Sequence, residues 1–260
     1  MKKSLLIILL SLTSIQLNAQ NLVPNWSFED TIACPWYYTQ INLATGWSTY
    51  KETPDYFNGC NDSLVSVPSN VEGFQYAHGG IAYSGVITYA SFTINYREIM
   101  GTQLSQPLNI GQKYFVSFFV SRAYDSTNML LLSSNKIGLR FSTIPFSYNT
   151  PAPVNNFAHV YIDSIVSDTL NWTKISGSLI ADSTYSYIAI GNFYDDSNTS
   201  ISNLDTSIFN EFAYYYIDDI KISTDSVFVN TAIRDYSSDL IKIFPNPAKD
   251  WIVLEGKGIK

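Results

Sequence analysis

The sequence predicts an all-β protein whose body is an antiparallel two-sheet sandwich. Segments between residues 21 and 224 alternate apolar and polar residues, or run apolar with many β-branched and aromatic side chains, as strands do. No window longer than about ten residues carries a convincing apolar stripe with the 3.6-residue period of a helix. Because turn residues separate these segments and no helical crossover joins them, we expect antiparallel sheets packed face to face.

Five segments carry the strand pattern most clearly. In chain order they are Lys113–Ser121, Lys136–Ser142, Trp172–Ala181, Tyr185–Phe193 and Ala213–Ser223. Gly111, Pro145 and the polar loop 195–203 mark turns between them. Residues 227–238 are polar and weakly patterned, and predict a linker after a sandwich domain that spans residues 20–226.

Composition and charge exclude two classes of partner. The 260 residues are 46% hydrophobic and only 14% charged, and 15 Lys+Arg against 22 Asp+Glu give a net charge of −7. A nucleic-acid-binding surface needs clustered cations, and so does a polybasic contact with a membrane. We therefore expect no nucleic-acid partner and no polybasic membrane contact.

The amino terminus has the pattern of a secretory signal peptide over residues 1–19. Lys2 and Lys3 precede the apolar run Leu5–Leu12, and Leu17-Asn18-Ala19 supplies a cleavage site. The run is shorter than the roughly 20 residues that span a bilayer. No later segment is apolar for 18 residues, so we expect an exported protein without a transmembrane segment.

The carboxyl terminus carries two short apolar stretches around Pro245-Asn246-Pro247. Proline cannot donate to a sheet ladder, so Phe244 should end one strand and Trp251 should belong to the next. Over residues 239–258, and most specifically in Phe-Pro-Asn-Pro-Ala, the chain resembles the opening of the C-terminal sorting domain of the type IX (Por) secretion system of Bacteroidota. The resemblance implies an incomplete small β-sandwich tail over 239–260, the type IX secretion machinery as a partner, and an extracellular or cell-surface location.

The two ends of the sandwich carry a second resemblance. Asn21-Leu22-Val23-Pro24-Asn25-Trp26-Ser27-Phe28-Glu29 and Tyr215-Tyr216-Ile217-Asp218-Asp219-Ile220 resemble the opening and closing segments of galactose-binding-like jelly rolls, a group with many carbohydrate-binding modules. Trp26 stands where glycine is commoner in that group. The resemblance implies a jelly roll whose first and last segments are neighbours, and function inferred from it rests on analogy.

In the resembled modules, the glutamate of the opening segment and an aspartate of the last strand hold a structural calcium ion. This implies Glu29 and Asp219 as ligands here, and Asp218 less directly, because strand alternation sends adjacent side chains to opposite faces. Converging carboxylates repel, and Ca²⁺ prefers oxygen ligands. The alternative is a set of solvated acids at strand ends.

Cys34 and Cys60 are the only cysteines. In an oxidising compartment two cysteines most often pair, and closing this loop contributes roughly 3–4 kcal/mol. Free buried thiols are the alternative. Too few ligands are present for a zinc site, because only His78 and His159 could join the cysteines and neither has ligand spacing.

Aromatic residues crowd the loop that this disulfide would close. Sugars present C–H faces that stack on rings, so residues 35–60 are the candidate glycan surface. The candidate glycan-binding residues are Trp36, Tyr37, Trp47, Tyr56 and Phe57. The alternative is that these rings fill the core, as aromatic residues in sandwiches often do.

Known catalytic motifs are absent from the sequence, so we assign no catalytic residue. Arg97 and Glu98 are adjacent, and we expect a structural ion pair rather than a ligand clamp.

The leading hypothesis is a non-catalytic, carbohydrate-binding secreted protein. The alternatives are a structural or adhesive surface protein that binds protein partners, and a glycan-active hydrolase built on a pair of distant carboxylates.

Overall fold

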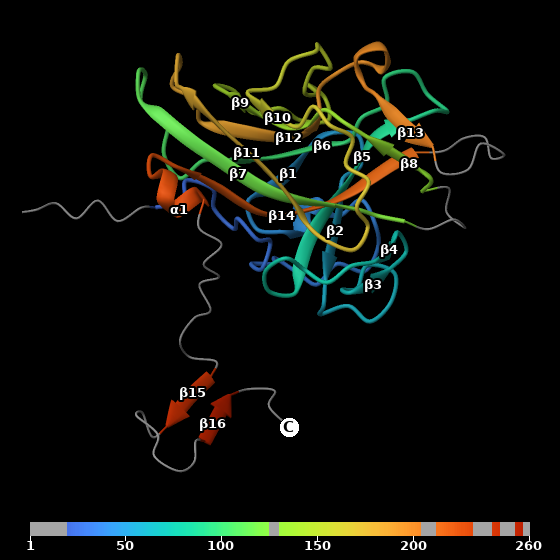
Figure 1. The fold of residues 1–260 in the computed structure, drawn as a ribbon, viewed down its shortest axis with the longest axis vertical. Helices are drawn as coiled ribbons and strands as arrows, with labels where there is room; N and C mark the ends of the chain where they lie inside the picture. The colour runs from blue at the N-terminus through green and yellow to red at the C-terminus, as the bar shows by residue number, and fades with distance from the viewer. Residues whose placement is uncertain (1–19, 125–129, 204–211, 231–240, 245–252, 257–260) are drawn as a thin grey trace, which may run out of the picture.

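The strands of the body form two five-stranded antiparallel sheets, which confirms the predicted fold class (Figure 1). The computed structural model describes residues 20–124, 130–203, 212–230, 241–244 and 253–256. The first sheet has the order β1-β6-β12-β9-β10, with strands at Trp47–Lys51, Ile99–Gln103, Tyr187–Asn192, Ile137–Ser142 and Val160–Tyr161. The second has the order β11-β7-β14-β5-β2, with strands at Thr173–Ile180, Lys113–Arg122, Phe212–Ser223, Ala82–Ala90 and Asp55–Asn58.

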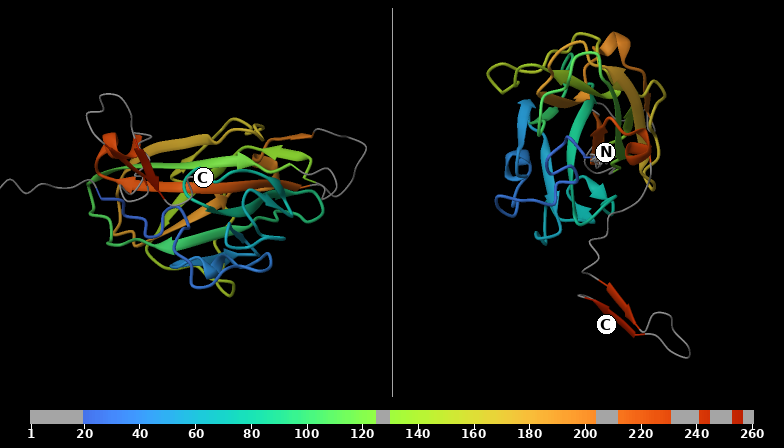
Figure 2. Two further views of the ribbon diagram at one scale, coloured as in Figure 1. Left: turned by 90° about the horizontal axis from the view of Figure 1, so that it is seen from below. Right: turned by 90° about the vertical axis from the view of Figure 1, so that its left-hand side faces the viewer.

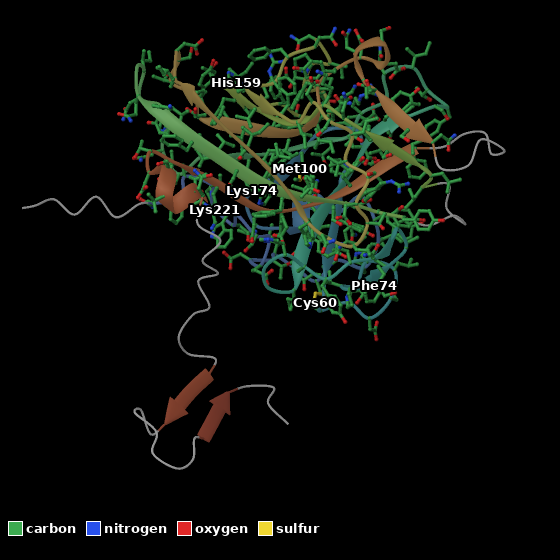
Figure 3. All side chains as sticks on the ribbon, in the orientation of Figure 1. Cys60, Phe74, Met100, His159, Lys174 and Lys221 are labelled. Carbon is green, nitrogen blue, oxygen red and sulfur yellow. A yellow bond between two sulfur atoms is a disulfide. The ribbon has the colours of Figure 1, made fainter. Side chains whose placement is uncertain are left out.

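The connectivity is that of a jelly roll. The chain crosses from one sheet to the other between β1 and β2, again between β5 and β6, and at most later connections. These crossings stack the two sheets face to face (Figure 2). The apolar faces of both sheets share one core, in which Met100 of β6 lies near the centre of the body (Figure 3).

Strand β14 explains how one sheet can carry two apolar layers. Its side chains alternate, and Tyr215 and Ile217 belong to the core between the sheets. Tyr214 and Tyr216 point to the opposite face, where they join a second buried cluster on the outer side of the sheet. Apolar residues on both faces make β14 an almost continuous hydrophobic run.

The opening segment lies beside the last strand of the body, as the second resemblance implies. Leu22 N donates to Ile222 O at 2.8 Å, and Ile220 N donates to Trp26 O at 2.9 Å. The segment forms turns rather than a regular strand. Phe28 and Ile217 share the same core, so the two ends close one body.

A short helix, α1 at Ser226–Asn230, stands where the sequence predicts the start of a linker at 227–238. Asp225 caps its first turn by accepting a hydrogen bond from a backbone N–H at 2.7 Å. Val229 is buried, and Lys174, labelled in Figure 3, donates to the Val229 carbonyl at 3.3 Å. The body therefore extends to residue 230.

Short elements lie at the edges of the body. Two small ladders pair β3 with β4 and β8 with β13, and two 3₁₀ turns accompany them. Their bounds are Ser69–Asn70, Gly73–Phe74, Leu132–Ser134, Ile201–Asn203, Ile41–Leu43 and Asp196–Asn198.

The tail contains one antiparallel strand pair within its described residues. β15 at Ile241–Phe244 pairs with β16 at Val253–Gly256, and β15 ends at Phe244 as predicted. Trp251 and the predicted signal peptide at 1–19 lie outside the described residues. In the described part of the chain, no helix has the length and apolar character needed to cross a membrane.

Candidate functional site

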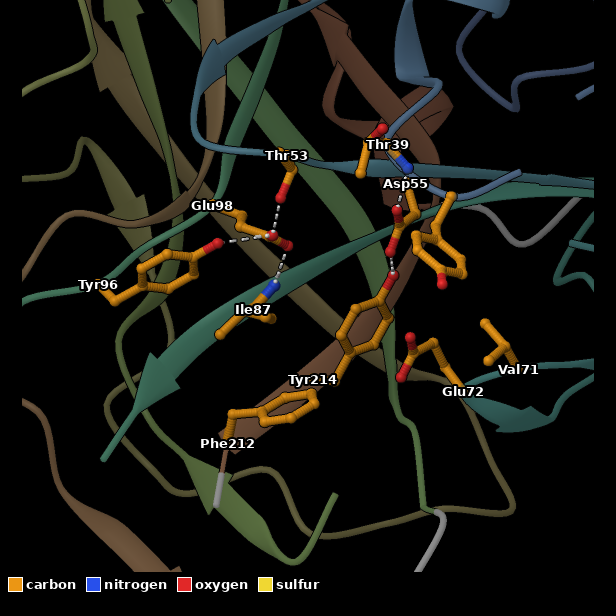
Figure 4. A pocket seen from close by; sticks show the side chains of 11 residues that line it. Thr39, Thr53, Asp55, Val71, Glu72, Ile87, Tyr96, Glu98, Phe212 and Tyr214 are labelled. Carbon is orange, nitrogen blue, oxygen red and sulfur yellow. Dashed lines mark hydrogen bonds between the residues drawn. The ribbon is translucent and has the colours of Figure 1, made fainter. Parts of the chain in front are cut away.

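A pocket opens on the outer face of the second sheet, over β2, β5 and β14 (Figure 4). Its volume is about 360 Å³. Its wall combines aromatic rings, hydroxyl groups and carboxylates. The lining residues are Tyr38, Thr39, Thr53, Asp55, Val71, Glu72, Ile87, Tyr96, Glu98, Phe212 and Tyr214. Rings offer stacking surfaces and carboxylates offer hydrogen-bond acceptors, so the pocket combines the two kinds of contact that a polar ligand with apolar faces would need.

Asp55 at the start of β2 forms one side of the pocket. Its carboxylate accepts hydrogen bonds from the Thr39 backbone N–H and from the Tyr214 hydroxyl. Burial raises the pKa of Asp55 to about 6, although these two hydrogen bonds act in the opposite direction. Gly85 of β5 makes the second contact possible, because a Cβ atom there would lie 2.1 Å from the Tyr214 hydroxyl oxygen.

Glu98 forms the opposite side of the pocket, just before β6. It accepts hydrogen bonds from Thr53 Oγ1 at 2.7 Å, from the Ile87 backbone N–H at 2.8 Å and from the Tyr96 hydroxyl at 3.3 Å (Figure 4). Burial and the charge of Asp55 raise the pKa of Glu98 well above its ordinary value. The two carboxylates therefore act on each other across the pocket.

The predicted ion pair between Arg97 and Glu98 is wrong. Arg97 Nη2 pairs with Asp196 Oδ1 at 2.9 Å, and Arg97 Nε donates to the Tyr194 carbonyl. Adjacent side chains in extended backbone point to opposite faces, so Arg97 and Glu98 enter different surroundings. Sequence adjacency suggested a pairing that the backbone geometry prevents.

A third carboxylate, Glu72, reaches the pocket from the turn between β3 and β4 (Figure 4). All three acids surround the ring of Tyr214. Burial, followed by the charges of Asp55, Glu72 and Glu98, raises the pKa of the Tyr214 phenol well above its ordinary value. Tyr214 therefore stays protonated and remains a hydrogen-bond donor to Asp55.

The predicted disulfide between Cys34 and Cys60 is present, with a Cα–Cα distance of 6.0 Å. It ties the end of β2 to the loop that carries three consecutive rings. The Trp36 and Tyr37 ring centroids are 5.8 Å apart, and those of Tyr37 and Tyr38 are 3.8 Å apart. Trp36 is 68% exposed and Tyr37 39% exposed, while Tyr38 lines the pocket. The loop thus presents a run of mutually tilted aromatic rings beside the pocket.

Three of the predicted glycan-binding rings are core residues instead, so the prediction is wrong for Trp47, Tyr56 and Phe57. All three are buried, and Trp47 packs on Phe28 at 4.7 Å between ring centroids. Both faces of β2 are covered: Tyr56 belongs to the core between the sheets, and Phe57 belongs to the outer cluster with Tyr83. Neither face leaves a ring open to a sugar.

The fold brings the three predicted metal-binding acids to one loop. Glu29 Oε1 accepts from the Ile81 and Ala82 backbone N–H groups at 3.0 Å each. Asp218 Oδ2 accepts from the Gly79 backbone N–H at 3.0 Å. Asp219 contacts His78 through Oδ2, whereas its buried Oδ1 has no hydrogen-bond partner among the described residues.

A bulge explains why two adjacent aspartates reach the same loop. The register of β14 shifts between Asp218 and Lys221, and Asp219 has a φ of 51°, in the left-handed region. The expectation that alternation separates Asp218 from Asp219 is therefore wrong. Nevertheless, no group of three or more His, Cys, Asp or Glu side chains within the described residues is arranged to hold a metal ion. The calcium ion stays a prediction.

No protein-family model and no curated protein matches this sequence. Three solved structures illustrate what it is similar to. The CBM22-1–GH10 modules of xylanase 10B from Clostridium thermocellum, complexed with xylohexaose, align at 16% identity with a TM-score of 0.37, over 72% of this chain and 27% of that one. The CBM22-1 xylan-binding domain of Paenibacillus barcinonensis Xyn10C aligns at 12% identity with a TM-score of 0.41, over 79% of this chain and 94% of that one.

The K1 cleaved adhesin domain of Lys-gingipain from Porphyromonas gingivalis aligns at 14% identity with a TM-score of 0.39, over 77% of this chain and 96% of that one. This chain spans about a quarter of the length of the xylanase chain. At these identities and scores the likeness says nothing about a ligand. Evidence for a function therefore comes from the pocket and its neighbouring rings.

Proposed function

We propose that this chain is an exported carbohydrate-binding protein that holds a glycan in the pocket between Asp55 and Glu98. The observation that carries the proposal is a cavity of about 360 Å³ whose wall combines four aromatic rings with three carboxylates. The C–H faces of a sugar stack on rings, and its hydroxyl groups donate to carboxylates. An oxidising destination agrees with the disulfide between Cys34 and Cys60.

Binding to a panel of plant, microbial and host polysaccharides tests this proposal. In affinity gel electrophoresis, we expect retardation of the full chain by at least one polysaccharide. Tyr38→Ala should abolish the retardation, because Tyr38 lines the pocket and contacts the exposed ring of Tyr37. Tyr148→Ala is the matched control, since Tyr148 is 73% exposed on the loop between β9 and β10, away from the pocket.

A second candidate function, glycoside hydrolysis, is favoured by the pair of carboxyl groups that line one pocket with raised pKa values. Binding without turnover remains the better proposal. Both Asp55 oxygens and both Glu98 oxygens already accept hydrogen bonds from other groups of the protein, so they are less available to act on a substrate. Release of reducing ends from a bound polysaccharide, abolished by Glu98→Gln, would favour the hydrolase. Binding without such release would favour the binding protein.

The route of export belongs to the same proposal. The tail resembles a type IX sorting domain, and such a tail would bring the protein to the type IX machinery and the cell surface. Deletion of residues 239–260 from the full chain should trap it in the periplasm of a Bacteroidota host. Equal secretion of the shortened chain would remove the tail from the proposal.

A structural calcium ion between the opening segment and β14 completes the proposal. The donor chemistry supports this part of the proposal, because the Glu29 and Asp219 carboxylates offer oxygen donors of like charge and Asp219 Oδ1 is buried without a partner among the described residues. Backbone carbonyls would have to complete the coordination. An ion there would hold the two ends of the body together and would take no part in ligand binding.

A further inference from the structure

The charge of the pocket is one-sided. Asp55, Glu72 and Glu98 line it, and no Lys, Arg or His stands among the lining residues in the described part of the chain. Arg97, the cation next to Glu98 in sequence, is directed to Asp196 instead. Ionised, the three carboxylates give the pocket a formal charge of −3.

Burial strengthens the repulsion between these acids when they are ionised. Asp55 is only 5% exposed and Glu98 only 3% exposed, so solvent screens their interaction weakly. Burial first, and then the charge of the neighbouring acids, raises the pKa of Glu98 and of the Tyr214 phenol, so each acid disfavours ionisation of the other groups. A cation in the pocket would relieve this repulsion, whereas an anionic ligand would add to it.

The walls suit a cation that is part of a larger ring-shaped ligand. Aromatic faces attract cations, and the pocket offers the rings of Tyr38, Tyr96 and Phe212, whereas the Tyr214 ring is packed in the outer cluster. Phe92, 48% exposed, extends this surface, with ring centroids 5.6 Å from Tyr96 and 6.4 Å from Phe212.

On the other side, the exposed pair Trp36 and Tyr37 continues from Tyr38. Rings therefore flank the pocket on two sides, and a chain of several sugars can extend past it in both directions.

We propose that this pocket selects a glycan that carries an unsubstituted amino group, a glucosamine-type chain, and rejects uronic-acid chains. This inference rests on the proposed function and specifies its ligand. The protonated amine would sit among the three carboxylates, with the sugar faces on the surrounding rings. Hydroxyl groups would add hydrogen bonds but no positive charge.

Isothermal titration of the full chain with four tetrasaccharides tests the inference at pH 7 and 50 mM NaCl. The ligands are β-1,4-linked tetramers of glucosamine, N-acetylglucosamine and glucose, and a tetramer of galacturonic acid. We expect the glucosamine tetramer to bind at least tenfold more tightly than either neutral tetramer, and the galacturonic acid tetramer not to bind. Binding of the glucosamine tetramer should weaken at 500 mM NaCl and at pH 5.

A matched pair of charge-neutralising variants separates the pocket from the bulk charge of −7. Glu72→Gln removes one pocket charge from the turn between β3 and β4 and keeps the length of the side chain, and it should weaken glucosamine binding at least threefold without affecting neutral chains. Asp163→Asn makes the same charge change at a side chain that is 78% exposed and outside the pocket, and should leave binding unchanged.

Two results would overturn the inference while the proposed function stands: equal affinity for glucose and glucosamine tetramers that still depends on Tyr38, or equal losses in Glu72→Gln and Asp163→Asn. Failure of all four tetramers and of every polysaccharide in the panel would overturn the proposed function together with the inference.

Discussion

Replacing Tyr214 with phenylalanine should destabilise the protein in a pH-dependent way. The Tyr214 hydroxyl donates to the buried Asp55 carboxylate, whose other donor is the Thr39 backbone N–H. Tyr214→Phe keeps the ring that packs in the outer cluster and removes this donor alone. The buried Asp55 carboxylate then has one hydrogen bond fewer to offset its burial.

The magnitude follows from the charge on Asp55. A hydrogen bond to a charged group contributes about 1.5–3 kcal/mol, and one between neutral groups about 0.5–1.5 kcal/mol. Burial raises the folded-state pKa of Asp55 from its ordinary value of 3.8 to about 6. At pH 8 Asp55 is ionised, so Tyr214→Phe should cost about 1.5–3 kcal/mol, or roughly 3–12 °C in Tm. At pH 5 Asp55 is largely protonated, so the cost should fall to about 1 kcal/mol.

Urea denaturation of the full chain, followed by tryptophan fluorescence at pH 8 and pH 5, measures both free energies of unfolding. Tyr148→Phe serves as the control, because Tyr148 is 73% exposed, and should change the free energy by less than about 0.5 kcal/mol. A Tyr214→Phe cost below about 0.5 kcal/mol at pH 8, or an equal cost at both pH values, would refute the role assigned to this hydrogen bond.

Further predictions concern the pH dependence of the wild type, the packing of Gly85, the disulfide and the calcium ion. Because the folded-state pKa of Asp55 exceeds its unfolded value, the free energy of unfolding should fall as pH rises from about 4 to about 6, and urea titrations of Asp55→Asn should show a weaker fall. Gly85→Ala should cost at least about 2 kcal/mol and abolish glycan binding, because its Cβ atom would meet Tyr214; unchanged denaturation and binding would contradict this. Opening the Cys34–Cys60 disulfide, which closes a 26-residue separation, should cost about 3–4 kcal/mol, and calorimetry of Cys34→Ser checks it. Calcium should raise the Tm of the wild type but not that of Glu29→Gln, and equal thermal shifts in both would exclude this site.

The fold was predictable because its determinants are local or lie at the two ends of the body. Alternation in segments such as Lys113–Ser121 predicts strands whatever their partners are. The resemblance of the opening and closing segments to jelly rolls implied that the two ends are neighbours, and Phe28 and Ile217 share one core. The disulfide was predictable because only one pairing exists. Helix α1 escaped prediction because five residues carry too little periodicity to distinguish a helix from a linker.

The pocket was not predictable because its residues come from separate strands and loops. Asp55 and Glu98 are 43 positions apart in sequence, and each looks like an ordinary strand-end acid. The bulge at Asp219 also has no clear sequence signal, although it decides where two carboxylates point. Among the aromatic residues, the burial of both Tyr56 and Phe57 requires knowing that β2 is covered on both faces.

A crystal structure of the full chain with its tightest-binding glycan is the most direct measurement of the role assigned to the pocket. We expect a sugar ring between the Asp55 and Glu98 carboxylates, stacked on Tyr38, with neighbouring sugars toward Trp36. A glycan bound on the outer face of the other sheet, with no sugar between these two carboxylates, would contradict it.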